Sequence, residues 1–406
     1  MSQVPPLPLE DAQAQLLALA TPLATEQIAV ENSIGQYLAR SVNARRTQPA
    51  ADLSAMDGYA VRSDDLGGPW KVIGESAAGH PYSGAQRPGE AVRVSTGSVM
   101  PSDARAVILQ EDIERQGQDI SLSGTLPDPP GKHIRLKGMD FANGNEVLKA
   151  GTRIGPAQAA LAISSGHAEV AVYRQPKVAI IDSGDELAPD PTNCAPHQIP
   201  ASNGVMLAAM ANSLPCSVKR LGPVADDMDA IAETLSQVDS ADIVVTSGGA
   251  SVGDHDLIRP SLEAWGAEID FWRVAIKPGK PLLVATRQGP AGRQIILGLP
   301  GNPVSSHVTA FLFMLPLIRA LLGASKPLPL RFRTRLAAPL KAGGKRREFL
   351  RAHWDGEAIT PNPIQDSGAL ASLSASNALI DRPAGAPSAR AGDDVFAFLI
   401  QNGGIA

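Results

Sequence analysis

Cysteine, aromatic residues and an excess of basic charge are all scarce in this sequence, and each shortage excludes a class of protein. The 406 residues include two cysteines, Cys194 and Cys216, which form no CxxC pair, so neither a disulfide framework nor a cysteine-based zinc site is expected. Aromatic residues make up 4% of the chain, and the formal net charge is −5. With few rings for base stacking and no long basic stripe, we expect no nucleic-acid partner. The cysteine usage fits a reduced, cytoplasmic setting.

Long hydrophobic runs are missing as well. The first apolar stretch, residues 15–20, follows acidic residues instead of a basic region, which is not the pattern of a signal peptide. The most apolar window, Val308–Leu322, is interrupted by Pro316 and Arg319 and is too short to span a bilayer. We therefore expect no membrane association.

Common nucleotide- and metal-binding signatures are also absent. The chain has no GxxxxGK[ST] P-loop and no GxGxxG after an expected strand, and its seven histidines show no HExxH pattern. The sequence thus predicts neither a P-loop nucleotidase nor a histidine-based metal site.

Glycine and proline, in contrast, are abundant, at 38 and 34 residues. No Gly-X-Y period or low-complexity tract accounts for them, so they belong in turns and tight loops that join many short elements. The length corresponds to roughly two to four domains.

The first half of the chain changes character twice. Residues 9–40 have one apolar side between polar ones and are predicted to be helical. Residues 45–146 carry short alternating apolar runs separated by glycine and proline, which indicates a mostly β domain. Gly155-Pro156 then opens a helix that runs to Ser165 and stops at Gly166, and we expect this helix to pack on the first one.

The second half begins with strands and helices in alternation, which predicts a parallel sheet with helices on its faces. The expected strands lie near 177–182, 216–221, 242–246 and 293–298, and the expected helices near 203–213, 227–238, 254–265 and 302–322. After a proline-rich linker, residues 327–406 return to short alternating strands. The predicted fold is therefore multidomain α/β plus β, with a central α/β parallel-sheet domain, a mostly β second domain, a helical segment and a small C-terminal β domain.

Polar or glycine-rich residues follow each expected strand of the parallel sheet. Ligands bind beyond the carboxyl ends of such strands, so four special loops at one sheet edge predict a single site. The four loops are Ser183–Leu187, Asp226-Asp227, Thr246–Gly249 and Leu299–Pro303.

Three further patterns suit an anionic ligand, and each also has a purely structural reading. The glycines of the loop from Thr246 to Asp256 let backbone N–H groups approach an anion, although a tight turn with a capping aspartate has the same composition. The turn Lys277–Pro281 holds two lysines near each other, where a dianion would relieve their repulsion, although a solvated hairpin turn is equally compatible. Arg346 or Arg347 could make a bidentate contact to an oxyanion or simply begin an exposed strand.

Acidic residues recur in the loops, and together with phosphate they make sense if a hard cation such as Mg²⁺ bridges the charges. Singly, each acid could equally be a helix cap or a surface residue.

Taken together, the sequence motifs of this chain resemble those of the molybdopterin molybdenumtransferases, the family of bacterial MoeA proteins and the gephyrin E domain. The likeness runs from about residue 8 to 400 in matching order. The strings that carry it are Ser54–Arg62, Ser183–Leu187, Thr246–Gly249, Gly253–Asp256, Lys277–Pro281 and Gly298–Ser305.

The resemblance implies a fold, an assembly and a reaction. The fold would comprise a helical dimerisation domain (1–44 with 147–176), a mostly β domain (45–146), an α/β molybdopterin-binding domain (177–326) and a C-terminal β domain (327–406). The assembly would be an elongated homodimer whose cleft lies between the α/β domain of one subunit and the β domain of its partner. The reaction would be Mg²⁺-dependent insertion of molybdate into adenylylated molybdopterin with release of AMP, and transfer partners would be found among molybdoenzymes.

Residue by residue, the same resemblance implies site roles. The catalytic residues would be Asp57, Asp140, Glu186, Asp226, Asp256, Lys277 and Lys280, and the metal would be held by Glu186, Asp226 and Asp256. Substrate would be bound by Thr96, Ser183, Gly184, Asp185, Thr246, Ser247, Gly248, Gly249, Pro300, Gly301, Ser305, Arg346, Arg351 and Ser367. Cations and hydroxyl donors suit molybdate, a tetrahedral dianion. Where the family usually has Ser-Thr-Gly-Asp-Glu, this chain has Asp182-Ser183-Gly184-Asp185-Glu186, which adds a charge beside the cleft.

Three alternatives stay open at this point. The first is the adenylyltransferase of the preceding step, which shares the Thr-Ser-Gly-Gly type of loop but leaves residues 45–145 and 330–406 unexplained. The second is a non-catalytic scaffold like gephyrin, which needs no aligned set of acids and lysines. The third is a tungsten-specific variant, because tungstate has nearly the size and charge of molybdate.

Overall fold

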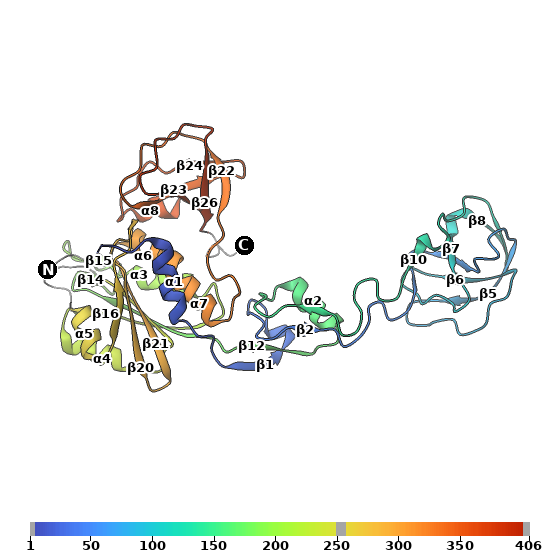
Figure 1. The fold of residues 1–406 in the computed structure, drawn as a ribbon, viewed down its shortest axis with the longest axis horizontal. Helices are drawn as coiled ribbons and strands as arrows, with labels where there is room; N and C mark the ends of the chain where they lie inside the picture. The colour runs from blue at the N-terminus through green and yellow to red at the C-terminus, as the bar shows by residue number, and fades with distance from the viewer. Residues whose placement is uncertain (1–4, 249–256, 401–406) are drawn as a thin grey trace.

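The computed structural model describes residues 5–248 and 257–400 of the chain. The molecule is elongated (Figure 1). The α/β domain and the C-terminal domain lie together at one end, the mostly β domain lies at the other, and a slender middle segment joins them. The predicted combination of α/β and β domains is confirmed.

The α/β domain is built on one six-stranded sheet. Its strand order is β16-β13-β17-β21-β20-β18, with the first four strands parallel to one another. The four parallel strands are β13 (Lys177–Ser183), β16 (Ser217–Val224), β17 (Ile243–Ser247) and β21 (Gly292–Leu299). These are the four strands predicted from the alternating pattern, which is therefore confirmed.

Two further strands, β18 (Glu268–Trp272) and β20 (Leu283–Gly289), were not predicted. They run antiparallel at one side of the sheet, and β20 forms a hairpin with β21. A hairpin adds strands without an intervening helix, so the strand–helix alternation carries no signal of it.

Helices cover both faces of this sheet. One face carries α3 (Asn203–Ala211) and the continuous helix formed by α6 (Pro303–Thr309), a π-helical turn (Ala310–Met314) and α7 (Leu315–Leu321). The other face carries α4 (Met228–Ser236) and α5 (Ile258–Ala264). The two apolar cores lie on opposite sides because alternate residues of each strand point to opposite faces. Thus Ile180 belongs to the first core and Ile181 to the second.

The expectation that the apolar segment ending at Leu322 is too short for a membrane is wrong as to length. Pro303–Leu321 is one helix of 19 residues, long and apolar enough to cross a bilayer by length and composition. However, 89% of its most apolar window is buried inside the protein, where Phe311, Phe313 and Leu317 are fully enclosed. The helix thus serves as the central core helix of this domain.

The prediction of helix over residues 9–40 is wrong beyond Leu19. Only α1 (Leu9–Leu19) is α-helical in this range, because β1 (Thr25–Ala29) pairs antiparallel with β12 (Glu169–Tyr173) and Val30–Asn32 form a single 3₁₀ turn. Pro22 explains the break, because a proline disfavours helical backbone at the residue before it.

The two N-terminal helices also do not pack on each other as expected. The apolar side of α1 joins the core around Phe311, and the Gln13 side-chain amide donates to the Leu312 carbonyl oxygen at 2.9 Å. The predicted second helix, α2 (Pro156–Ser164), is present but covers a separate core that includes Leu38, Ile154 and Val172. Amphipathic periodicity shows that a helix has an apolar side but not what covers it.

The middle segment (residues 20–44 and 146–176) leads the chain into the β domain and back. It contains β1, β12, α2 and the pair β2 (Val42–Asn43) with β11 (Glu146–Leu148). The β domain itself is a six-stranded sheet of order β7-β4-β6-β5-β9-β8 around Trp70, Ile108 and Ile120. Its strands are β4 (Gly58–Val61), β5 (Trp70–Ser76), β6 (Glu90–Val94), β7 (Ala106–Leu109), β8 (Ile113–Gln116) and β9 (Asp119–Leu122), and a separate short pair joins β3 (Leu53–Ser54) to β10 (Ile134–Arg135).

The C-terminal domain is the predicted small β domain, and it borrows one strand from the α/β domain. Its order is β19-β23-β24-β22-β26-β25, and an additional β23–β25 pairing curls the sheet into a barrel-like form. The strands are β19 (Ile276–Lys277), β22 (Phe332–Leu336), β23 (Arg347–Trp354), β24 (Ala358–Pro361), β25 (Ala378–Arg382) and β26 (Asp394–Leu399), and α8 (Leu370–Ser374) lies beside them. Because β19 pairs with β23, the lysine turn of one domain is fixed beside the basic strand of the other.

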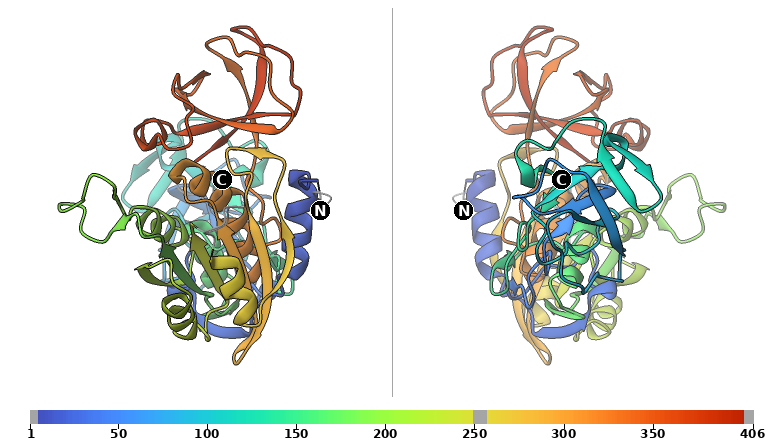
Figure 2. Two further views of the ribbon diagram at one scale, coloured as in Figure 1. Left: turned by 90° about the vertical axis from the view of Figure 1, so that its left-hand side faces the viewer. Right: turned by 90° about the vertical axis from the view of Figure 1, so that its right-hand side faces the viewer.

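Figure 2 views the molecule along its length and shows a loop that projects sideways from the α/β domain. This loop joins two short parallel strands, β14 (Leu187–Ala188) and β15 (Ile199–Pro200). The strand β14 follows β13, and β15 leads into α3. Both therefore lie at the carboxyl edge of the main sheet, next to the polar and glycine-rich loops predicted to form the site.

Candidate active site

A cavity of about 440 Å³ lies at the carboxyl edge of the parallel strands, where the sequence predicts a ligand site. Its walls come from the loops after β13, β17 and β21 and from the start of α3. Gly368 and Leu370 of the C-terminal domain complete it. None of the described residues that line the cavity is aromatic, so a flat ligand there is held by backbone, aliphatic and polar groups.

Two helices begin at this cavity. Ser202 and Asn203 at the start of α3, and Asn302 and Pro303 at the start of α6, all line it. The unpaired N–H groups of a helix N-terminus carry partial positive charge, so both favour an anionic ligand. The Asn203 side-chain amide also donates to Ser247 Oγ at 2.9 Å and to the Gly301 carbonyl oxygen at 2.7 Å, which ties three loops together.

One loop glycine is required where it stands. Gly248 has φ of +101°, and a Cβ there would lie 2.6 Å from the Ser183 carbonyl oxygen. A side chain at Gly248 would push the loops after β13 and β17 apart, so their close approach depends on glycine. A Cβ at Gly301 would lie 3.6 Å from the Gly248 Cα, which is an ordinary van der Waals contact.

Hydroxyl groups of these loops are largely buried. Ser183 and Ser247 line the cavity, whereas Thr246 is not among its lining residues and is only 1% exposed. Within the described part of the chain, Ser183 Oγ and Thr246 Oγ1 are buried without a hydrogen-bond partner. The backbone of this loop is therefore better placed to contact a ligand than the Thr246 hydroxyl.

Acidic residues of two neighbouring loops bind each other's backbone. The Asp226 N–H donates to Asp185 Oδ1 at 3.1 Å, and the Asp185 N–H donates to Asp226 Oδ2 at 3.5 Å. Glu186 lines the cavity, with its carboxylate against Gly184. Asp227 has a different task, because it accepts the Asp229 and Ala230 N–H groups and caps α4.

The structure describes two of the three predicted metal ligands. Glu186 and Asp226 lie in these adjacent loops, while Asp256, together with Gly249 of the predicted cradle, lies outside the described residues. Among residues 5–248 and 257–400, no three His, Cys, Asp or Glu side chains gather as a ready metal site. Mg²⁺ commonly uses one or two carboxylates with substrate phosphates and water, and Glu186 and Asp226 fit that pattern.

Asp182 is the buried acid of the cavity wall. Its side chain is 3% exposed, Oδ2 accepts the Gly204 N–H at 3.0 Å, and Oδ1 has no partner among the described residues. Burial raises the pKa of Asp182, against the smaller lowering effects of the Gly204 hydrogen bond and the Arg220 charge. The extra charge noted in the sequence is therefore a poorly solvated one.

Replacing Asp182 by asparagine should stabilise the protein at neutral pH. Because the folded pKa of Asp182 lies above its unfolded value, its contribution to stability is present at low pH and is lost as the pH rises through the folded pKa. Asp182→Asn keeps an oxygen for the Gly204 N–H and removes the charge. We expect the Tm to rise by about 2 °C or more at pH 7.5, and the difference to vanish near pH 4, in thermal unfolding followed by circular dichroism. A lower Tm for the variant at pH 7.5 would show that the carboxylate is stabilising.

The turn with the two lysines lies against α6. Gly279 has φ of +101°, and its would-be Cβ lies 2.6 Å from Thr309 Cγ2 and 3.6 Å from the Ser305 carbonyl oxygen. In the same helix the Val304 N–H donates to the Ser367 carbonyl oxygen at 3.1 Å. The predicted oxyanion ligands Lys277, Lys280, Ser305 and Ser367 are thus on adjoining segments.

The structure also separates the two arginines between which the sequence could not choose. Arg347 makes a bidentate ion pair with Asp381, with both N–O distances at 2.6 Å, and also contacts Glu10. Arg346 donates to the Ile276 carbonyl oxygen at 3.2 Å, one residue before Lys277. Arg346 is therefore the arginine that accompanies the lysine turn.

Arg351 was predicted to bind substrate, but the structure places it in the interior. It is fully buried, and it donates to Ser372 Oγ and to the carbonyl oxygens of Ile364 and Asp366, each at 2.9 Å. These contacts hold the segment that carries Ser367, so Arg351 supports that segment and is not among the described residues that line the cavity.

The remaining predicted residues lie far from this cavity within one chain. Asp57 and Thr96 belong to the β domain, at the other end of the molecule (Figure 1). Thr96 donates to Asp57 Oδ1 through its N–H at 2.6 Å and its hydroxyl at 3.1 Å, and these bonds lower the pKa of Asp57. Asp140 lies in the same region, where its N–H donates to the Gln48 carbonyl oxygen. A single chain does not bring these three to the other site residues.

Sequence reasoning missed Asn203, Leu370 and Ile199 as parts of the cavity. Asn203 follows Ser202 in a helix-starting pair, which is a detectable signal. Leu370 and Ile199 come from a distant segment and a projecting loop, and aliphatic residues there carry no recognisable pattern.

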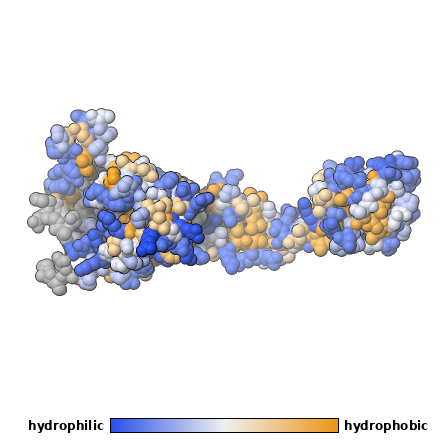
Figure 3. Space-filling view, turned by 90° about the horizontal axis from the view of Figure 1, so that it is seen from above, coloured by the Kyte–Doolittle hydropathy of each residue, from blue (hydrophilic) through white to orange (hydrophobic). Residues whose placement is uncertain are grey.

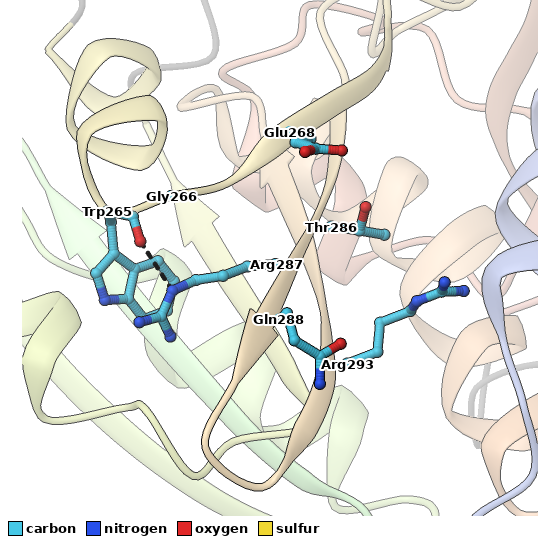
Figure 4. A pocket seen from close by; sticks show the side chains of 7 residues that line it. All are labelled: Trp265, Gly266, Glu268, Thr286, Arg287, Gln288 and Arg293. Carbon is cyan, nitrogen blue, oxygen red and sulfur yellow. Dashed lines mark hydrogen bonds between the residues drawn. The ribbon is translucent and has the colours of Figure 1, made fainter.

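A second cavity of about 350 Å³ lies at the opposite, amino edge of the parallel strands (Figure 4). Its most distinctive group, Arg287, stacks on the Trp265 ring at 3.9 Å and donates to the Trp265 carbonyl oxygen, Asp239 and Gln294. The Arg287 guanidinium is already bonded to neighbouring residues of the fold. This cavity is therefore a weaker candidate for a ligand site than the first one.

Comparison with known proteins follows the order of these domains. Three family models match the chain: "MoeA N-terminal region (domain I and II)" over residues 7–166, "Probable molybdopterin binding domain" over 179–320, and "MoeA C-terminal region (domain IV)" over 333–399.

Curated relatives and solved structures agree with these matches. A molybdopterin molybdenumtransferase of Nostoc is 36% identical over 389 residues, 92% of this chain and 88% of the relative. One of Staphylococcus aureus is 30% identical over 413 residues, 98% and 96% of the two chains. The crystal structure of a molybdopterin biosynthesis MoeA protein from Pyrococcus horikoshii superposes with a TM-score of 0.83 at 27% identity, covering 97% of this chain and 100% of that one.

Proposed function

This chain belongs to the molybdopterin molybdenumtransferase family, enzymes of molybdenum cofactor biosynthesis, and on that premise we propose that its cleft inserts molybdate into adenylylated molybdopterin, with Mg²⁺-dependent cleavage of the pyrophosphate link and release of AMP. The proposal rests on one observation: two features that favour anions lie next to each other. A cavity with two helix N-termini lies at the sheet edge, and a cationic turn lies against one of those helices.

The cationic turn suits the molybdate. Lys277, Lys280 and Arg346 supply positive charge, and Ser305 and Ser367 supply hydroxyl donors, from segments that the structure holds together. A tetrahedral dianion offers several oxygens to such donors at once, and charge-assisted hydrogen bonds are the stronger kind.

The cavity suits the pterin and phosphate parts of the nucleotide-linked substrate. Gly248 and Gly301 line the cavity together with Ser183 and Ser247, and the predicted residues Gly184, Asp185 and Pro300 are their neighbours in the same loops. Because no described lining residue is aromatic, the pterin is held without ring stacking.

Glu186 and Asp226, with Asp256, would hold Mg²⁺ next to the phosphates. When bound, the ion neutralises phosphate charge during anhydride cleavage. The acids of this chain would orient a water molecule and accept its proton as the water oxygen bonds to one phosphorus, while the other phosphate leaves with the bridging oxygen.

The proposal includes a homodimer whose second copy supplies Asp57, Thr96 and Asp140 to the cleft. Two observations support it: these residues lie far from the cavity within one chain, and large apolar side chains are exposed away from it. Ile34 and Ile163 of the middle segment are 50% and 59% exposed, and Leu136 and Met139 of the β domain are 61% and 64% exposed. Figure 3 shows apolar surface over both regions. The expected cytoplasmic location and transfer of the product to molybdoenzymes complete the proposal.

The direct test is a reaction with purified components. Adenylylated molybdopterin, molybdate and Mg²⁺ should yield AMP and active molybdenum cofactor together, and removal of Mg²⁺ by a chelator should stop both. If ATP and molybdopterin instead yield the adenylylated intermediate, the protein is the adenylyltransferase. If neither reaction occurs with intact, folded protein, the scaffold alternative stands. Competition between molybdate and tungstate decides the preferred metal.

A further inference from the structure

The first lysine of the cationic turn already has a partner. Lys277 Nζ lies 3.2 Å from Glu348 Oε1. The pair is fixed by the backbone, because β19 and β23 run side by side with Lys277 directly opposite Glu348. The lysine side chain is 56% exposed, whereas the glutamate side chain is 13% exposed. A largely enclosed carboxylate thus sits at a lysine that the cleft would use for an anion.

Two glycines stand beside this carboxylate. A Cβ built at Gly343 or Gly344 would lie 3.5 or 3.8 Å from a Glu348 carboxylate oxygen, at van der Waals distance. As glycines, neither residue places a side chain against the carboxylate. The pair with Lys277 is the ion pair that Glu348 makes among the described residues.

Charge then sets up a competition. An oxyanion at Lys277 would lie within a few ångströms of the carboxylate, and like charges at that distance repel strongly where water is partly excluded. The Lys277 ammonium group cannot pair closely with the Glu348 carboxylate and with the oxyanion at the same time. Either the carboxylate leaves or the oxyanion binds weakly.

We propose that Glu348 is a built-in counter-ion, which an incoming tetrahedral oxyanion must displace from Lys277 and which thereby sets the oxyanion affinity of the cleft. The inference rests on the proposed function, in that Lys277 binds the substrate oxyanion. Glu348 occupies the lysine in the empty cleft and returns to it on release. It therefore tunes affinity and is not itself a catalytic residue.

The experiment measures binding of molybdate and of sulfate to the full-length protein by isothermal titration calorimetry. Glu348→Gln keeps the shape of the side chain and removes its charge. We expect this variant to bind both oxyanions about fivefold tighter or more, the size expected for loss of one partly exposed competing ion pair. The matched control is Asp394→Asn, which removes one negative charge from the exposed Arg333–Asp394 pair of the same domain. It should leave binding unchanged.

A double variant separates displacement from general electrostatics. In a Lys277→Ala background there is no lysine to compete for, so Glu348→Gln should give a clearly smaller gain than in the wild type. An equal gain in both backgrounds would overturn displacement, because it would show that the charge acts at a distance. Weaker binding by Glu348→Gln would overturn the proposal in another way, since Glu348 would then be orienting Lys277 for the anion.

Failure of the premise looks different. If Lys277→Ala binds both oxyanions as well as the wild type, Lys277 is not in an oxyanion site, and both the proposed function of this turn and the counter-ion role fall. If Lys277→Ala weakens binding while Glu348→Gln leaves it unchanged, the oxyanion site stands and the counter-ion role alone is overturned.

Discussion

Lys277→Ala and Lys280→Ala should each lower kcat/KM for molybdenum insertion about 100-fold or more, while the fold stays intact. The loss is expected because removal of one fixed donor to a charged reacting group costs enzymes on the order of 100- to 1,000-fold. Both lysines flank Gly279, which packs so closely on α6 that an added Cβ would lie 2.6 Å from Thr309 Cγ2, so the turn that carries them is held against the helix. The measurement is AMP release at saturating adenylylated molybdopterin with varied molybdate.

The matched control for these variants is Lys326→Ala, which removes an exposed lysine from the linker after α7. It changes the net charge equally and should keep wild-type activity. If either turn variant retains more than half of the wild-type kcat/KM, the cationic turn is not the molybdate site.

Mixing two inactive variants should restore activity, because each cleft would draw residues from both copies. Asp57→Asn alters the acid of the β domain, and Lys280→Ala alters the turn beside the α/β domain. In a mixed dimer, one cleft contains both changes and the other contains neither. Each mixed dimer keeps one intact cleft of two, so mixed dimers purified free of the other two forms should show about half of the wild-type activity per dimer.

This complementation is measured after co-expression of two differently tagged variants and purification through both tags. Each variant combined with itself is the control and should stay inactive. Absence of recovery in a verified mixed dimer would place Asp57 in the same cleft as Lys280 of its own chain, or outside the reaction.

Much of the fold was predictable because it follows from periodicity and spacing. The buried strands around Ile180, Val244 and Ile296 and the helices between them gave the parallel sheet, and the sheet edge gave the site. The hairpin of β20 with β21 left no such alternation, and Pro22 ended α1 in a segment that otherwise looked amphipathic. These errors concern which elements form locally, and they did not move the predicted site.

Several predicted site residues line one cavity, while their part in binding and catalysis stays a prediction. The sequence could not decide whether Arg346 or Arg347 accompanies the lysine turn, because the ion pair of Arg347 with Asp381 forms only in the folded protein. It could not show that Arg351 is enclosed by the carbonyl groups of its own domain, nor that Asp182 lies without full solvation in the cavity wall. Burial and partner choice depend on contacts between distant segments, which a single sequence does not display.

The most direct test of the account is to locate the oxyanion itself. Crystals of the protein soaked in tungstate, a heavy isostere of molybdate, should show an anomalous difference peak beside Lys277, Lys280 and Ser305, with the Glu348 carboxylate moved away from Lys277. An ordered tungstate elsewhere on the protein, with no peak at this turn, would contradict the assignment of the cleft.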